Sequence, residues 1–181
     1  HNTAIGQAEL FVAHRGYEKL LAGIEPLAER AWKNHEKIRI GYLSPDFRRH
    51  VMVSFIYGLF VRFDRARFEV YAYSLAEEDG FTEALKEHAT AWRDVAGLSF
   101  AEIAERIRAD EIDVLVDLAG HSAGGALPVL AYRPAPVQVS GLGYVNTTGL
   151  SAVDYFLTDD IVDPPGRHDA LFTEEPVCLT S

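Results

Sequence analysis

The sequence predicts an α/β fold: a Rossmann-like parallel sheet with helices on both faces, preceded by an N-terminal helix. Runs rich in β-branched and aromatic residues alternate along the chain with runs that have apolar residues at helical spacing. Such repeated strand–helix–strand order implies parallel strands joined by right-handed connections. The run "IDVLVDLAG" is also apolar apart from its two aspartates, which is typical of a strand buried on both faces.

The first part of the chain predicts a helix and a linker. Between residues 8 and 32, apolar residues recur at helical spacing, and the pattern weakens at Gly23 and Pro26. The polar stretch "KNHEK" follows. We therefore expect residues 1–36 to form a helical segment with a linker, and residues 37–181 to form the α/β lobe.

Within the lobe, strands and helices are expected to alternate. Ser99 and Glu102 form an S-x-x-E capping box, which marks the start of one helix. The expected helices cover 51–63, 82–89 and 99–110, with a short fourth helix after the Gly-rich turn that follows residue 120. The expected strands lie within 38–43, 68–74, 91–97, 112–120, 135–144, 154–160 and 174–181.

Composition excludes several classes of protein. The chain has 27 acidic and 17 basic residues and a formal net charge of −10, which argues against non-specific binding to nucleic acid or to an anionic membrane. One cysteine rules out an internal disulfide framework and a Cys-rich zinc site. No apolar run reaches the ~18 residues of a membrane span, and the N-terminus lacks signal-peptide features. We expect a cytoplasmic protein without a bound metal.

Four polar or Gly-rich loops follow the predicted strands: "SPDFRRH", "SLAEEDG", "AGHSAGG" and "GLGYVNTTG". In a parallel sheet they share the carboxyl edge, where ligands bind. None contains a dinucleotide or P-loop fingerprint. His50 ends the first of these loops, and histidine is the side chain that exchanges protons nearest neutral pH. It is either a site residue or a surface histidine that caps a helix.

One motif suggests a serine hydrolase instead. Gly120-His121-Ser122-Ala123-Gly124 fits G-x-S-x-G, in which the serine is the nucleophile on a strand-to-helix turn. Asp159 or Asp163, followed by His168, could supply the other two members of a triad. This five-residue pattern also arises by chance.

Six segments, taken in order, resemble one family. "RIGYLSPDFRRH", "DVLVDLAGH", "RPAPVQV", "LGY", "TTGL" and "DY" are similar to the N-terminal half of the catalytic region in the O-GlcNAc transferase / SPINDLY family. The resemblance implies the N-terminal lobe of a two-lobed, inverting GT-B glycosyltransferase that uses a nucleotide sugar without a metal or other cofactor. It also implies a second, nucleotide-binding lobe outside this chain, and in some members an upstream TPR region.

The resemblance assigns roles to particular residues. His50 matches the family's active-site histidine, as proton acceptor or as the group that holds the acceptor. Asp79 matches an acidic residue near the acceptor backbone, although an aspartate before glycine is also a good turn residue. Leu142 and Gly143 match a turn against the sugar, where Gly143 could instead relieve a tight bend. His121 matches a residue that lines the cleft.

Besides "GYVNTTG", which stands where members have "GYPGTTG" and so places Val145 and Asn146 there, the chain departs from the family pattern at two positions of this region. Many members have arginine where Ala126 stands and tryptophan where Gly141 stands. These changes remove an anion-binding group and a large packing surface. Asp117, within the apolar strand, is interpreted as a hydrogen-bonded buried group and not as a catalytic acid.

The sequence thus favours a lobe that helps to move GlcNAc from UDP-GlcNAc to Ser/Thr hydroxyls of proteins and is inactive alone. The expected partners are a nucleotide-sugar donor, a protein acceptor, the second catalytic lobe and an upstream TPR region. The alternatives are a related fucosyl- or glucosyltransferase, a non-catalytic protein-binding module of the family, and the serine hydrolase.

Overall fold

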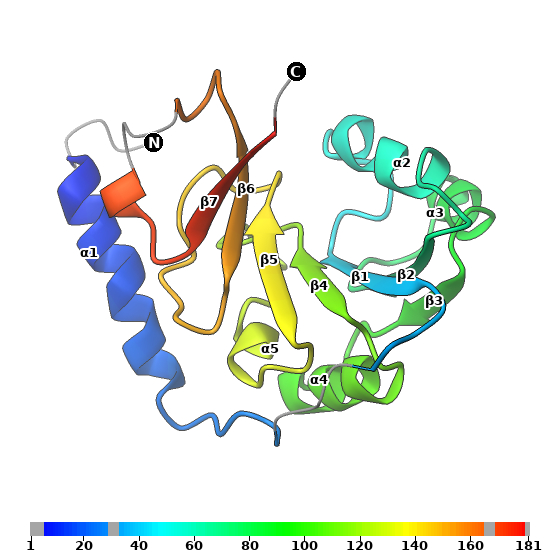
Figure 1. The fold of residues 1–181 in the computed structure, drawn as a ribbon, viewed down its shortest axis with the longest axis horizontal. Coiled ribbons are helices and arrows are strands. Elements are labelled where there is room, and N and C mark those ends of the chain that lie inside the picture. Colours follow the sequence, from blue (N-terminus) through cyan, green and yellow to red (C-terminus); the bar gives the residue numbers. More distant parts are fainter. Residues whose placement is uncertain (1–5, 29–32, 165–168, 180–181) are drawn as a thin grey trace.

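A computed structural model describes residues 6–28, 33–164 and 169–179 (Figure 1). This part of the chain forms one seven-stranded sheet in the order β3-β2-β1-β4-β5-β6-β7, in which all neighbours pair in parallel. The α/β prediction is confirmed. The strands are β1 Ile38–Ser44, β2 Phe68–Ser74, β3 Ala91–Asp94, β4 Val114–Asp117, β5 Val137–Gly141, β6 Tyr155–Asp159 and β7 Glu175–Leu179.

The strand order reverses direction between β1 and β4. The chain moves outward from β1 through β2 to β3, returns to place β4 beside β1, and then moves outward through β5, β6 and β7. Ligands of open α/β sheets bind at such a switch point, outside the carboxyl ends of the strands. The loops after β1 and β4 flank this point, and they contain His50 and His121.

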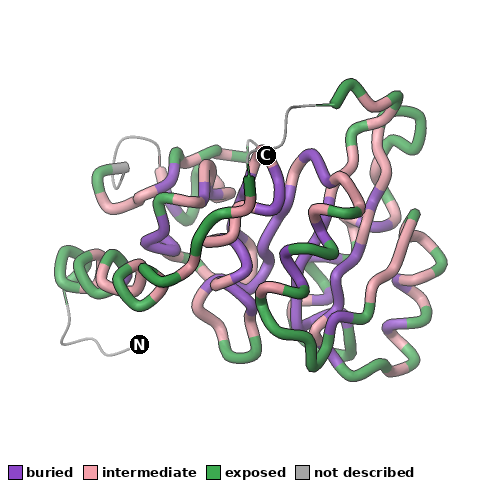
Figure 2. Tube along the Cα trace, turned by 90° about the horizontal axis from the view of Figure 1, so that it is seen from below, coloured by how far each residue is buried: buried purple, intermediate pink, exposed green. Residues whose placement is uncertain are grey.

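Helices cover both faces of the sheet, as predicted. On one face, Ile56 and Phe60 of α2 pack with Leu85 of α3 in a buried apolar cluster. On the other face, Ile103 of α4 and Leu130 of α5 belong to a second cluster. Burying one such side chain contributes about 1.5–3 kcal/mol, and the buried residues run along the interior in Figure 2. The helices are α2 Val53–Val61, α3 Gly80–Lys86, α4 Phe100–Ala109 and α5 Pro128–Ala131.

The N-terminal helix is shorter than the predicted 8–32. It consists of α1 (Gln7–Tyr17) and a 3₁₀ turn, η1 (Glu18–Leu21). Gly23 is unfavourable in a helix and Pro26 lacks the donor that a helix requires. Leu27 N–H instead donates to the carbonyl of Tyr132 at 2.8 Å. The chain therefore leaves the helix and packs against the residue that follows α5. Residues 29–32 of the prediction lie outside the described residues.

α1 lies along the side of the lobe next to the short 3₁₀ helix η2 (Asp169–Leu171) (Figure 1). A Cβ on Gly149 would come within 2.2 Å of the His14 carbonyl oxygen, and Gly149 has φ +73°. Ser151 N–H donates to the Glu18 carboxylate at 2.8 Å. The loop after β5 therefore packs tightly against this helix, although much of the helix surface is exposed (Figure 2).

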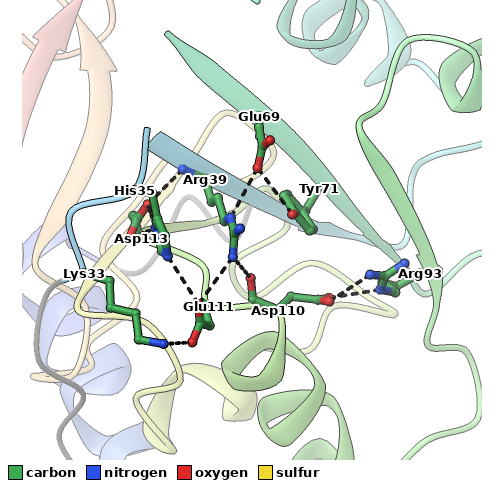
Figure 3. A network of polar contacts seen from close by, with 9 residues as sticks. All are labelled: Lys33, His35, Arg39, Glu69, Tyr71, Arg93, Asp110, Glu111 and Asp113. Carbon is green, nitrogen blue, oxygen red and sulfur yellow. Dashed lines mark hydrogen bonds and ion pairs between the residues drawn. The ribbon is translucent and has the colours of Figure 1, made fainter. Parts of the chain in front are cut away.

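The amino edge of the sheet lies opposite the carboxyl edge that bears His50. There a network of polar and charged residues joins the strands (Figure 3). The buried Asp113 carboxylate accepts hydrogen bonds from Arg39 N–H and from His35 Nδ1, both at 2.9 Å. Arg93 pairs with Asp110 at 2.8 Å. The network fixes the linker before β1, and its part-exposed ion pairs contribute little individually. Its other members are Lys33, Glu69, Tyr71 and Glu111.

Among the described residues, no helix has the length and apolar character needed to cross a membrane.

Candidate functional site

The loop after β1 is held firmly from both ends. Ser44 Oγ accepts a hydrogen bond from Asp46 N–H at 3.0 Å, which tightens the turn at the strand end. The Phe47 side chain is fully buried, and the Phe47 carbonyl accepts a hydrogen bond from Thr82 Oγ1 of α3 at 2.8 Å. This anchoring leaves His50 exposed at the carboxyl edge of the sheet, the position that the sequence predicts.

His50 contacts its own loop through one ring nitrogen. Nδ1 lies 3.3 Å from Asp46 Oδ1 and 3.4 Å from Met52 N. The His50 side chain is 41% exposed, whereas that of Asp46 is only 12% exposed. Nε2 makes no polar contact with any described residue, so it is free to meet a ligand.

Asp79 links the His50 loop to the next element. Its Oδ1 accepts hydrogen bonds from the N–H groups of Phe81 and Thr82 at 2.8 and 3.1 Å, which makes Asp79 the N-cap of α3. Its Oδ2 accepts from Arg49 N–H at 2.7 Å. The hydrogen bond from Arg49, followed by those from α3, lowers the pKa of Asp79. The structure thus brings Asp79 beside the His50 loop, and its contact with an acceptor stays a prediction.

Asp117 has a structural role, as interpreted from the sequence. Its side chain is fully buried and accepts hydrogen bonds from Ser140 Oγ at 2.8 Å and from Gly120 N–H at 2.7 Å. Burial raises its pKa, and these hydrogen bonds oppose that shift. Asp117 therefore ties the loop after β4 to β5.

Gly143 permits close approach between two strand ends. A Cβ at this position would lie 2.0 Å from the carbonyl oxygen of Leu118, directly after β4. The preceding residue, Leu142, has φ +71°, and its side chain faces a pocket of about 320 Å³ that Phe55 of α2 also lines. The glycine is thus required by the backbone, and contact of either residue with a sugar stays a prediction.

His121 packs toward α1. Its ring lies 4.9 Å from that of His14 and 4.8 Å from that of Tyr17, between centroids. Nε2 donates to the carbonyl of Thr148 at 2.8 Å. Its polar and ring contacts are therefore with α1 and the loop after β5, and it makes none with His50. The predicted site residues thus form two groups. Asp79 contacts the His50 loop, whereas His121 contacts the residues that follow Gly143.

Two further residues, His14 and Tyr144, shape this second group and were not predicted from the sequence. His14 Nδ1 donates to the Leu10 carbonyl at 2.8 Å, so His14 Nε2 accepts a hydrogen bond from the Tyr144 hydroxyl at 2.7 Å. Burial lowers the pKa of His14. Tyr144 directly follows Gly143, so α1 helps to position the predicted sugar-contacting turn. A histidine among the apolar positions of the predicted helix was the available signal.

The "TTG" segment is held by a buried carboxylate. Glu174 is 4% exposed, and it accepts hydrogen bonds from Thr147 Oγ1 at 2.6 Å and from Thr148 N–H at 2.7 Å. Glu174 lies immediately before β7. Glu174 therefore fixes the loop after β5 to the start of β7.

The geometry gives the serine hydrolase no support. Ser122 Oγ donates to the Gly143 carbonyl at 3.2 Å, and no histidine among the described residues bonds to it. His168, the proposed third member of that triad, lies outside the described residues.

The described residues contain no cluster of three or more His, Cys, Asp or Glu side chains suited to a metal ion. The absence of a metal from the chemistry stays a prediction.

A doubly wound parallel sheet with polar loops gathered at its carboxyl edge defines a ligand-binding α/β domain. The model of the family described as glycosyl transferase family 41 matches residues 25–177. The chain therefore belongs to glycosyltransferase family 41, which confirms the resemblance inferred from its motifs.

Individual relatives agree. The chain is 39% identical over 166 residues to the probable UDP-N-acetylglucosamine–peptide N-acetylglucosaminyltransferase SPINDLY of Arabidopsis thaliana, covering 87% of this chain and 18% of that protein. It is 34% identical over 146 residues to the UDP-N-acetylglucosamine–peptide N-acetylglucosaminyltransferase of Caenorhabditis elegans, covering 79% and 13%. A solved mutant of the Thermobaculum terrenum O-GlcNAc transferase is similar with a TM-score of 0.90 and 35% identity, covering 98% and 35%. The chain thus spans less than a fifth of these two curated relatives.

Proposed function

We propose that this chain is the N-terminal lobe of a cytoplasmic, inverting protein glycosyltransferase that moves GlcNAc from UDP-GlcNAc to Ser/Thr hydroxyls. Membership of family 41 and the names of the relatives support the reaction class and the donor. The observation that carries the proposal for this chain is His50, which lies in the loop after β1 beside the switch point. Its Nδ1 is 3.3 Å from a carboxylate oxygen, and its Nε2 makes no polar contact with the described residues.

His50 acts as the proton acceptor in this proposal. The hydroxyl oxygen of the protein acceptor attacks the anomeric carbon of GlcNAc, and the bond from that carbon to the UDP oxygen breaks. Nε2 takes the hydroxyl proton, and UDP leaves with the bonding electron pair. A single displacement of this kind inverts the anomeric centre. Proton transfer to a positioned base contributes about 10²–10⁴-fold to a rate.

Asp79 orients the acceptor in the same proposal. Its Oδ2 accepts one N–H at present, from Arg49, and a carboxylate oxygen can accept a second hydrogen bond. A backbone N–H of an extended acceptor peptide supplies that donor. Leu142 and Gly143 present the turn after β5 to the sugar, while the second lobe binds most of the nucleotide.

The two departures from the family pattern fit the local packing. The Ala126 side chain is 1% exposed, so the position has no room for an arginine in this arrangement. A Cβ at Gly141 would lie 2.7 Å from the Leu157 carbonyl oxygen, so a tryptophan would displace β6. Ala126 and Gly141 therefore match their surroundings. A protein-binding module without catalysis remains the second candidate, because the arginine that many members have at position 126 would bind an anion and this chain lacks it.

The test uses the full-length protein with a panel of donors. The protein is incubated with a Ser/Thr-containing acceptor and with UDP-GlcNAc, nucleotide-activated fucose or nucleotide-activated glucose, and the modified residues are mapped by mass spectrometry. Transfer of GlcNAc in preference to the other sugars is expected. Preferential transfer of fucose or glucose would identify the related enzymes, and no transfer from any donor would favour the binding module.

A further inference from the structure

We propose that Asp46 is a positioning residue that sets the tautomer of His50, by keeping the proton on Nδ1 and leaving the Nε2 lone pair directed toward the ligand. The inference rests on the proposed function, because it concerns how His50 becomes a proton acceptor. It assigns a role to a residue that contacts neither sugar nor acceptor.

The surroundings of the Asp46 carboxylate point to this role. The side chain is only 12% exposed, and its polar contact within the described residues is His50 Nδ1 at 3.3 Å. Asp79 differs, because its oxygens accept backbone N–H groups that close a helix and a loop. A largely buried carboxylate is costly unless it is paired, and the partner here is the histidine at the rim.

The loop fixes Asp46 before any ligand arrives. Its N–H donates to Ser44 Oγ, and the next residue, Phe47, is fully buried. The carboxylate is therefore placed by the strand end and the core, whereas the His50 ring is 41% exposed. The largely buried group thus orients the more exposed one.

Two contacts compete for His50 Nδ1, and they have opposite consequences. If Nδ1 donates to Asp46, Nε2 carries a lone pair and can accept a proton. If Nδ1 accepts from Met52 N–H, which lies 3.4 Å away, Nε2 carries the proton and cannot act as a base. In this structure the contact from Met52 N–H has hydrogen-bond geometry, whereas Asp46 lies within ion-pair distance of Nδ1. A hydrogen bond to a carboxylate is charge-assisted and about twice as strong as a neutral one, so in our proposal Nδ1 donates to Asp46.

The first experiment reads the tautomer directly. The full-length protein is labelled with ¹⁵N-histidine, and the His50 signals are assigned by their loss in His50→Gln. Wild type is expected to show a protonated Nδ1 and a bare Nε2 in its neutral form. In Asp46→Asn the population with a protonated Nε2 is expected to rise. A wild-type ring with its proton on Nε2, or a spectrum unchanged by Asp46→Asn, would overturn the proposal.

The second experiment measures transfer kinetics. Asp46→Asn is expected to lower kcat by about 10–10²-fold and to leave KM for UDP-GlcNAc within about threefold. Asp46→Glu, which restores the carboxylate, is expected to recover part of kcat. The matched control is Asp94→Asn, because Asp94 lies at the carboxyl end of β3 and accepts Ala96 N–H at 3.0 Å. Wild-type kcat in Asp46→Asn, or no recovery in Asp46→Glu when both variants are folded by circular dichroism, would contradict the role.

The two experiments separate this inference from the proposed function. If no donor is used but the tautomer changes in Asp46→Asn, the Asp46–His50 pair stands and the proposed reaction fails. If the protein transfers GlcNAc but the tautomer is indifferent to Asp46, the reaction stands and the positioning role fails. An unfolded Asp46→Asn variant still leaves the wild-type tautomer as a decisive result.

Discussion

The two aspartates near His50 use their carboxylates in different ways. Asp79 accepts hydrogen bonds from the backbone of Arg49 and of α3, so peptide dipoles compensate its charge. Asp46 faces the His50 ring. Its place four residues before His50 is visible in the sequence, but only the fold of the turn shows that the two side chains meet.

Gly143 makes the sharpest prediction for a single residue. Gly143→Ala is expected to destabilise the protein by about 2–4 kcal/mol, because the new Cβ would lie 2.0 Å from the Leu118 carbonyl oxygen and force the two strand ends apart. The free energy of unfolding, measured by urea denaturation, tests this.

The matched control is Gly58→Ala in α2. A Cβ at Gly58 meets nothing within 4 Å, and alanine is favoured over glycine within a helix by about 0.5–1 kcal/mol. This variant is expected to be slightly more stable than wild type. Equal stability of the two variants would show that the close approach at Gly143 is unimportant.

The bounds of helices and strands are predicted best where the sequence signal, such as a capping residue, lies within the element itself. The observed β2 coincides with the predicted 68–74, and α4 begins directly after the capping residue Ser99. The end of α1 was predicted too late because the chain beyond η1 is held by a bond to Tyr132, which is distant in sequence. Local periodicity carries no information about such a contact.

The candidate site likewise has some features that the sequence predicts and others that only the folded structure shows. The position of His50 at the carboxyl edge follows from a strand and the turn after it, which the sequence shows. The direction of the His121 ring depends on where α1 docks, because that ring packs against His14 and Tyr17. The pairing of His14 with Tyr144, 130 residues apart, likewise requires the folded structure.

The docking of α1 is expected to weaken at acid pH. Burial lowers the pKa of His14 in the folded protein, so the unfolded state binds the proton more readily. The stability that depends on neutral His14 is present above the ordinary histidine pKa, about 6.5, and is lost as the pH falls through the lower folded value.

Hydrogen exchange of the α1 amides tests this, with rates corrected for intrinsic exchange. Protection is expected to fall between pH 7.5 and 5 in wild type. In His14→Gln, protection is expected to be lower at pH 7.5 and to change less with pH. Protection that is independent of pH in wild type would contradict the role of His14.

For the whole molecule, we expect this 181-residue chain alone not to turn over a nucleotide sugar. Catalysis needs donor and acceptor held in one geometry, and in our proposal most of the nucleotide binds in another lobe. UDP release from UDP-GlcNAc and UDP binding by calorimetry are the measurements. Transfer, or tight UDP binding, by the chain alone would contradict the two-lobed account.

The activity of the full-length protein is expected to be unchanged by EDTA. The described residues offer no cluster of metal ligands, and in our proposal protein groups stabilise the leaving diphosphate. Loss of transfer in the chelator, with recovery on adding one divalent ion, would show that a metal takes part.

The most direct test of the account is the rate of transfer by full-length His50→Ala. We expect kcat to fall by roughly 10²–10⁴-fold if Nε2 accepts the hydroxyl proton. The free energy of unfolding is expected to fall by about 1 kcal/mol, because the His50 side chain is 41% exposed but its removal leaves the Asp46 carboxylate without this partner. The control His88→Ala, two residues after the end of α3, is expected to keep the wild-type rate. A His50→Ala rate within twofold of wild type would contradict the central claim.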